Sequence, residues 1–145
     1  VWLYPSRGGV MSVAVRVGGS YQPLVGDYDG DGNDDVLWYG PGSAADAVWY
    51  GGPFASFHTG PLNVWGRYDP VVLDLGGDGR DDVIWYAPGS GADSWFSWGA
   101  SRARSSRALR LDGTHRAVVG GLSAGGADGV FWYAPGSAVD VVWWR

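Results

Sequence analysis

Five aspartates lie within nine residues near the start of the chain, in residues 27–35. Counted from Asp27, carboxylates stand at positions 1, 3, 5 and 9, and glycines at positions 4 and 6 permit a sharp turn. Side chains at alternating positions of a tight loop converge on one point, and calcium takes about six to eight oxygen ligands in a flexible shell. The segment therefore predicts a calcium site. Its ligands would be four carboxylates and the backbone carbonyl of position 7: Asp27, Asp29, Asp31, Asp35 and Asn33.

The same nine positions recur twice further along the chain with fewer carboxylates. In residues 74–82 the aspartate of position 3 is replaced by Gly76. This second loop keeps weaker candidate ligands at positions 1, 5, 7 (through the carbonyl) and 9: Asp74, Asp78, Arg80 and Asp82. In residues 121–129 the four carboxylate positions carry only glycine and serine, so no metal is expected there.

Aspartate and glycine also form tight turns without a metal, because an Asp side chain accepts hydrogen bonds from nearby backbone N–H groups. The third loop indicates that the chain tolerates such a segment without carboxylates. Five aspartates within nine residues nevertheless repel one another unless a cation lies among them. Calcium is therefore the favoured interpretation of the first loop, and its expected role is to hold the turn rather than to take part in catalysis.

Aromatic residues form a second group that could bind a ligand, since the chain has 10 Trp and 8 Tyr. An indole ring stacks on the apolar face of a sugar, while a neighbouring carboxylate accepts hydrogen bonds from the sugar hydroxyls. The candidates for such a site are three tryptophans and three aspartates that recur beside the aromatic positions: Trp49, Trp95, Trp143, Asp46, Asp93 and Asp140. The alternative is that these aspartates cap the neighbouring Pro-Gly-Ser turns.

Catalytic constellations are missing from the sequence. There is no Glu, Lys or Cys, and His58 and His115 occupy non-equivalent positions outside any recognisable motif. Neither a G-x-S-x-G nucleophile elbow nor a phosphate-binding loop is present. The net charge of −5 disfavours a nucleic-acid partner, and a local cluster of arginines is interpreted as a solvated strand face. That cluster consists of Arg102, Arg104, Arg107 and Arg110. An enzyme is not expected.

The candidate residues belong to a tandem repeat of 47 residues. The dipeptide Trp38-Tyr39 recurs at 85–86 and at 132–133, each time followed by Pro-Gly-Ser, with no insertion or deletion between copies. A period of about 40–50 residues is typical of propeller-type arrays. The repeats comprise residues 23–69, 70–116 and 117–145. Residues 1–22 precede them and supply strands that could complete a neighbouring unit.

An all-β fold is expected, because Trp, Tyr and Val are abundant while the helix formers Glu and Lys are absent. In the first repeat we expect strands near 24–25, 36–39 and 47–50, with a fourth in the variable stretch that follows. The fourth strand is clearest in its N-terminal copy, residues 13–17, and residues 1–4 match a third strand. Adjacent residues of a strand face opposite sides, so the paired Trp and Tyr should pack on the two neighbouring units.

The loop at residues 27–35 and the 47-residue period together resemble the FG-GAP/VCBS repeat, whose calcium-bearing blades build integrin-type β-propellers. The resemblance spans the chain as three repeats, although the D-x-D-x-D-G-x-x-D loop is complete in the first copy only. It implies four-stranded propeller blades and a calcium-stabilised, non-catalytic module for binding or adhesion. It also implies a secreted or cell-surface location. A carbohydrate-binding lectin with sites between blades is the alternative function.

Three blades are too few for a ring, because propellers contain about 4–8. We therefore expect a homodimer that forms a six-bladed ring, in which each chain lends residues 10–17 to the last blade of the other. A trimer, a piece of a longer propeller and a β-trefoil are the alternatives. The chain begins inside a repeat, as expected of a mature product or an excised piece. No apolar run approaches the length of a membrane span.

Overall fold

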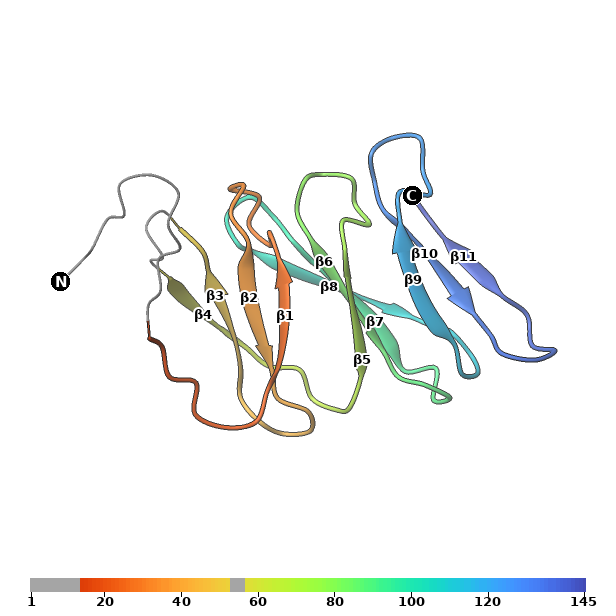
Figure 1. The fold of residues 1–145 in the computed structure, drawn as a ribbon, viewed down its shortest axis with the longest axis horizontal. Coiled ribbons are helices and arrows are strands. Elements are labelled where there is room, and N and C mark those ends of the chain that lie inside the picture. Colours follow the sequence, from red (N-terminus) through yellow and green to blue (C-terminus); the bar gives the residue numbers. More distant parts are fainter. Residues whose placement is uncertain (1–13, 53–56) are drawn as a thin grey trace.

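The computed structural model describes residues 14–52 and 57–145, and these form an all-β fold of eleven strands without a helix (Figure 1). None of the described elements is a helix that could cross a membrane. The strands of the first repeat are β1 (Gln22–Gly26), β2 (Asp35–Tyr39), β3 (Asp46–Tyr50) and β4 (His58–Leu62). Those of the second are β5 (Asp69–Leu73), β6 (Asp82–Tyr86), β7 (Asp93–Trp98) and β8 (Arg104–Leu109). The third has β9 (Arg116–Gly120), β10 (Gly129–Tyr133) and β11 (Val141–Trp143).

Each repeat makes its own antiparallel sheet, in which every strand pairs with its neighbours in sequence. Sheet 1 has the order β1-β2-β3-β4, sheet 2 the order β5-β6-β7-β8, and sheet 3 the order β9-β10-β11. The first strands begin at residues 22, 69 and 116, so the structural period equals the 47-residue period of the sequence. Within the described ranges no strand pairs with a strand of another sheet, and no sheet closes on itself.

This topology does not fit the β-trefoil alternative, which needs strands of all three units to pair in one barrel. It agrees with the expected strands at the first three positions of each repeat. The expected strand at residues 13–17 is wrong over its described part, because residues 14–17 are irregular. A strand needs a hydrogen-bonded neighbour, and none of the described strands pairs with this segment. The expectation for residues 1–4 lies outside the described residues.

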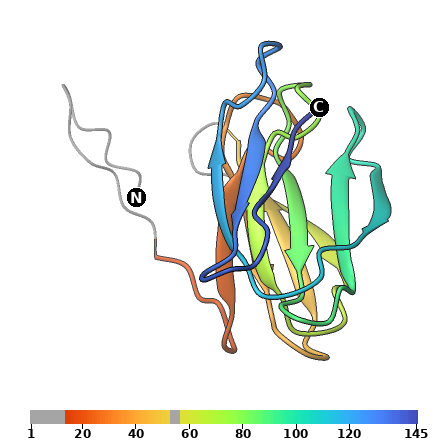
Figure 2. The same cartoon turned by 90° about the vertical axis from the view of Figure 1, so that its right-hand side faces the viewer.

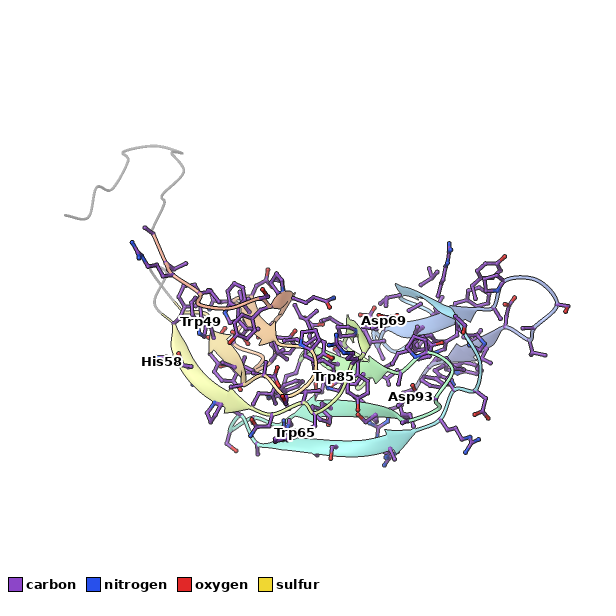
Figure 3. All side chains as sticks on the ribbon, turned by 90° about the horizontal axis from the view of Figure 1, so that it is seen from below. Trp49, His58, Trp65, Asp69, Trp85 and Asp93 are labelled. Carbon is purple, nitrogen blue, oxygen red and sulfur yellow. The ribbon has the colours of Figure 1, made fainter. Side chains whose placement is uncertain are left out.

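The sheets stack face to face through the repeated aromatic pair. The Tyr39 ring of sheet 1 lies 4.9 Å from that of Trp85 in sheet 2, and Tyr86 lies 4.9 Å from Trp132 in sheet 3. In sheet 2 the adjacent Trp85 and Tyr86 therefore contact opposite neighbours, as predicted. Figure 3 shows Trp85 between the sheets, whereas Trp65 lies on the outside of the molecule. Trp85 and Trp132, at the centres of the two junctions, are fully buried.

Aspartates at one repeated position brace each sheet where its second and third strands meet, and those of sheets 1 and 2 are buried. Both oxygens of Asp46 accept backbone N–H groups, from Gly40 at 2.7 Å and Val64 at 2.6 Å. Asp93 repeats this arrangement with other residues of sheet 2, and Asp140 accepts the N–H of Ala134 at 2.8 Å. The structure therefore corrects the sugar-binding prediction for Asp46 and Asp93. Their carboxylates are buried and hold the backbone, as the turn-capping alternative states.

Candidate metal centre

The first aspartate of the β1–β2 loop (residues 27–34) organises the turn. Its carboxylate accepts the backbone N–H groups of Gly30, Asp31 and Gly32 at 2.8, 3.1 and 2.9 Å. Gly30 and Gly32 have φ angles of 73° and 86°, a region that residues with a side chain rarely adopt. The glycines therefore permit the turn, and Asp27 holds it with three hydrogen bonds.

The β5–β6 loop (residues 74–81) lies at the same edge of the molecule and has the same turn (Figure 1). Asp74 accepts the N–H groups of Gly77, Asp78 and Gly79 at 2.7, 3.2 and 2.8 Å. Position 1 thus forms the turn in both loops, whether or not position 3 carries a carboxylate. Turn formation alone does not account for the extra aspartates of the first loop.

Three of the predicted ligands converge in the first loop. Asp27, Asp29 and Asp35 each present a carboxylate oxygen, and these oxygens lie within 4.8 Å of one another. Asp31 does not join them: it is exposed, and its Oδ1 accepts the backbone N–H and the Nδ2 of Asn33 at 2.8 and 2.9 Å. The structure therefore brings together positions 1, 3 and 9 of the predicted ligand set and leaves position 5 outside.

Asp29 carries the strongest indication of a missing partner. Its side chain is only 7% exposed, and its Oδ2 accepts hydrogen bonds from Arg102 Nη2 at 2.7 Å and Nε at 2.8 Å. Its Oδ1 is buried, and no donor in the described residues reaches it. Buried carboxylate oxygens normally have a partner, because leaving one unsatisfied costs about 1–3 kcal/mol or more. A cation at the centre of the cluster would satisfy this oxygen.

Arg102 reaches this site from the loop between β7 and β8, which belongs to the next repeat. Its φ of 60° is the single positive value among non-glycine residues of the described chain, and its guanidinium lies 4.3 Å from the centre of the Tyr50 ring. The interpretation of this arginine as part of a solvated basic face is therefore wrong. Sequence reasoning missed the ion pair with Asp29 because the two residues are 73 positions apart and lie in different repeats.

Asp35 is fully buried beneath the cluster, and its oxygens accept the backbone N–H groups of Tyr28 at 2.9 Å and Gly51 at 2.7 Å. Burial, together with the smaller effect of the charges of Asp29 and Asp27, raises the pKa of Asp35 to about 6 in spite of the two N–H donors, which lower it. A bound cation would offset both causes, because it favours the ionised carboxylate.

The second loop lacks a central carboxylate. Asp82 accepts the N–H of Gly76 at 3.1 Å, and burial raises the pKa of Asp82 to about 7. A side chain added at Gly76 would place its Cβ 3.7 Å from oxygens of both Asp74 and Asp82. Arg80 turns toward the first loop, where its Nε donates to the Asp29 carbonyl at 3.2 Å. Among the residues described, the predicted ligands of this loop do not form a cluster like that of the first loop.

We expect the free energy of unfolding, measured in chelator, to fall as the pH rises from about 4 to about 7. The folded pKa values of Asp35 and Asp82, about 6 and about 7, exceed the value of about 3.9 for an unfolded aspartate. The folded chain therefore releases these two protons at a higher pH than the unfolded chain does. Their contribution to the free energy of unfolding is complete below about pH 4, which is the pKa of an unfolded aspartate. It is lost as the pH rises past the pKa values of the folded chain.

Denaturant midpoints measured across this pH range would check the effect. Asp82→Asn should flatten the part of the slope nearest pH 7, whereas Asp69→Asn, at an exposed position, should leave the profile unchanged. A midpoint that rises between pH 4 and pH 7, roughly the interval set by these two carboxyls, would contradict the expectation.

Two of the predicted aromatic ligands line one groove between sheets 2 and 3. Trp95 and Trp143 bound this groove of about 360 Å³, together with Arg107 and the C-terminal Arg145. At the junction of sheets 1 and 2, the position equivalent to Arg145 is Trp98, which is buried and packs 4.8 Å from Tyr28. The groove is open because the corresponding residues, Arg145 and Leu75, do not fill that space.

Trp49 lies elsewhere, on the face of sheet 1 that points away from sheet 2, and its ring packs 5.2 Å from Trp38. It therefore does not share a site with Trp95 and Trp143.

The fold and the first loop together define an all-β repeat protein with a candidate cation site between its first two sheets. Comparisons with protein-family models, with curated proteins and with solved structures gave no match.

Proposed function

We propose that this chain is a non-catalytic binding or adhesion module of extracellular proteins, stabilised by a calcium ion in the first aspartate loop. The observation that supports it is the buried, unpartnered Oδ1 of Asp29 beside Asp27 and Asp35. Arg102 neutralises one of the three carboxylates, which leaves negative charge for a cation. Oxygen donors of this kind suit calcium, and the millimolar calcium outside cells matches a weak surface loop.

The ion would hold sheet 1 against sheet 2. Asp29 already receives Arg102 from sheet 2, and the Asp27 carbonyl accepts the N–H of Asp81 at 2.8 Å. A ligand that binds only the folded chain stabilises it by about 2.7 kcal/mol when present at about a hundred times its dissociation constant. Calcium would therefore stiffen the junction between the two repeats.

Calorimetric titration of calcium into the chelator-treated chain tests this function. We expect one ion per chain, with a dissociation constant on the order of 0.1–1 mM, and a melting temperature that rises by about 5 °C or more in excess calcium. Asp29→Asn should abolish both effects, and Asp78→Asn, in the second loop, should leave them unchanged. Binding that survives Asp29→Asn, or no binding at about 10 mM calcium, would contradict the proposal.

The three sheets are proposed to be propeller blades, and a second copy of the chain is proposed to complete a six-bladed ring. Four features support this arrangement: the meander topology, the constant period, the face-to-face stacking and the two outer faces, over which no described strand packs. Six blades fall within the usual range of about 4–8.

Carbohydrate binding is the second candidate function, and the groove lined by Trp95 and Trp143 favours it. The guanidinium groups of Arg107 and Arg145 each lie 5.7 Å from the centre of the Trp95 ring, so acidic sugars suit the groove best. A glycan array would test it. Trp143→Ala should remove the signal for acidic glycans, and Trp65→Ala, at an exposed position outside the groove, should not.

A further inference from the structure

A tyrosine latch joins sheet 1 to the linker that leads into sheet 2. The hydroxyl of Tyr39 donates to the carbonyl of Gly66 at 3.0 Å and accepts the N–H of Tyr68 at 2.9 Å. The same ring packs on Trp85, so one residue contacts both the linker and the face of the next sheet. Gly66 has a φ of 129°, which presents its carbonyl to the tyrosine.

The junction of sheets 2 and 3 repeats this latch with equivalent residues. The hydroxyl of Tyr86 donates to the carbonyl of Gly113 at 3.0 Å and accepts the N–H of His115 at 2.7 Å. Its ring packs on Trp132, and the φ of Gly113 is 96°. Two independent junctions therefore have the same arrangement, although the residue that donates its N–H is Tyr68 in one and His115 in the other.

Sheet 3 presents the same tyrosine on its outer face, where no described residue accepts its hydrogen bond. Tyr133 is 43% exposed, and its hydroxyl makes no hydrogen bond with the described part of the chain. Figure 2 looks onto this outer face, and no described element lies in front of sheet 3. The face is apolar, with five large exposed side chains at positions that are turned toward the next sheet in the other repeats: Val118, Leu122, Tyr133, Val142 and Trp144.

The outer face of sheet 1 carries the other half of the latch. Gly19 has a φ of 119°, the conformation of Gly66 and Gly113, yet its carbonyl accepts no hydrogen bond from a tyrosine hydroxyl of the described chain. Tyr21 follows it as Tyr68 follows Gly66, and its ring lies 6.5 Å from Trp38, the equivalent of Trp85. This segment is thus arranged to receive a tyrosine from a preceding sheet.

A pair of hydrogen bonds at the loop edge, one to a backbone carbonyl and one to a side chain, supports the same match. Asp81 N–H donates to the Asp27 carbonyl, and Asp27 N–H donates to Asp81 Oδ2, both at 2.8 Å. Asp128 and Asp74 repeat the two bonds at 2.8 and 3.2 Å. The equivalent residue on sheet 1 is Asp34, and it is exposed.

The matching backbone on sheet 3 is that of Gly121, which is also exposed. The glycine that precedes this position is crowded in sheet 1 and has free space around it in sheet 3. A Cβ at Gly26 would lie 2.9 Å from the Cβ of Asp81, whereas one at the equivalent Gly120 would meet nothing within 4 Å. Sheet 3 therefore lacks the aspartate that a following sheet would bring.

We infer that the outer faces of sheet 3 and sheet 1 are two halves of one junction, and that a second copy of this chain docks there head to tail. The inference rests on the proposed six-bladed ring and specifies its interface. Tyr133 of one copy packs on Trp38 of the other and bonds Gly19 and Tyr21. The Asp34 side chain of that copy accepts the N–H of Gly121. The contact is heterologous, and a heterologous contact closes a ring when the rotation that it imposes returns to the first copy; here two such junctions would close a ring of two copies.

Cysteine cross-linking tests the polarity of this contact, since the chain has no cysteine of its own. Asp34→Cys and Gly120→Cys in one chain place two thiols at positions whose internal equivalents, Asp81 and Gly26, bring their Cβ atoms close enough for a disulfide after a small shift. Under mild oxidation we expect a covalent dimer of the double variant. Each single variant should stay uncross-linked, because a head-to-tail contact never brings identical positions together.

Light scattering of the chain in calcium and in chelator gives the companion measurement, with a dimer expected in both. Tyr133→Phe should raise the dimer dissociation constant on the order of a hundredfold, because the hydroxyl loses both bonds at each of the two junctions. The same change at Tyr86 should lower the melting temperature and leave the mass unchanged, since that latch is internal.

Several outcomes would overturn the inference: cross-linking of a single variant, a monomer or trimer in solution, or a dimer that the double variant fails to trap. A monomer that still binds calcium would overturn the junction and leave the proposed calcium module standing. A trapped dimer that binds no calcium would support the junction and overturn the proposed calcium module.

Discussion

Gly76→Asp is expected to give the chain a second calcium site. The second loop already has the turn of the first, with Asp74 accepting the same three backbone N–H groups. The Cβ of a residue at 76 would lie 3.7 Å from oxygens of Asp74 and Asp82, in ordinary van der Waals contact, and the φ of Gly76 is not in the positive region. The new carboxylate would therefore occupy the place that Asp29 has in the first loop.

Calorimetric titration should show two ions per chain instead of one, with a dissociation constant on the order of 1 mM for the new site. In chelator the variant should be less stable than the parent, because a further carboxylate is packed among like charges. Ser123→Asp provides the matched control: it adds an aspartate at the same position of the third loop, where the other ligand positions are glycines. A stoichiometry that stays at one for Gly76→Asp would show that three converging carboxylates do not suffice.

Trp85→Ala should remove a large part of the stability of the chain. Trp85 is fully buried between sheets 1 and 2, where its ring lies 4.9 Å from Tyr39, 6.0 Å from Tyr68 and 5.7 Å from Phe96. Replacing a buried tryptophan by alanine costs about 3–5 kcal/mol, and domains of this size are stable by about 5–15 kcal/mol. The unfolding midpoint in urea should therefore fall steeply, and calcium should recover only part of the loss.

Trp65→Ala is the matched control, because Trp65 is 72% exposed and lies outside the core (Figure 3). Its free energy of unfolding should stay within about 0.5 kcal/mol of the parent. Equal losses for the two variants would mean that Trp85 does not join the sheets in solution.

The strands and their order could be predicted from the sequence because each repeat pairs only with itself. The 47-residue period, the Pro-Gly-Ser turns and the alternation of apolar residues locate the first three strands of every repeat without knowledge of its neighbours. The three-carboxylate cluster could be predicted for the same reason, since Asp27, Asp29 and Asp35 belong to one loop.

Features that depend on two repeats could not be predicted in this way. The ion pair between Asp29 and Arg102 joins residues with no fixed spacing pattern. The groove at Trp95 opens because the position of Trp98 in one repeat is Arg145 in the next, a difference that has no meaning until the sheets are stacked. Residues 14–17 alternate like a strand but pair with no strand that the structure describes, so local propensity alone misplaces them.

The sequence-local pairing of the strands has a consequence for how the chain acquires its structure. Each sheet is complete before the chain reaches the first strand of the next, so no pairing has to wait for a distant segment. Pairing between neighbouring segments closes only short loops, whereas all-β domains with distant pairings fold in about milliseconds to seconds. During synthesis, sheet 1 can form while sheet 3 is still inside the ribosome, which shortens the time for which its strand edges are open to other chains.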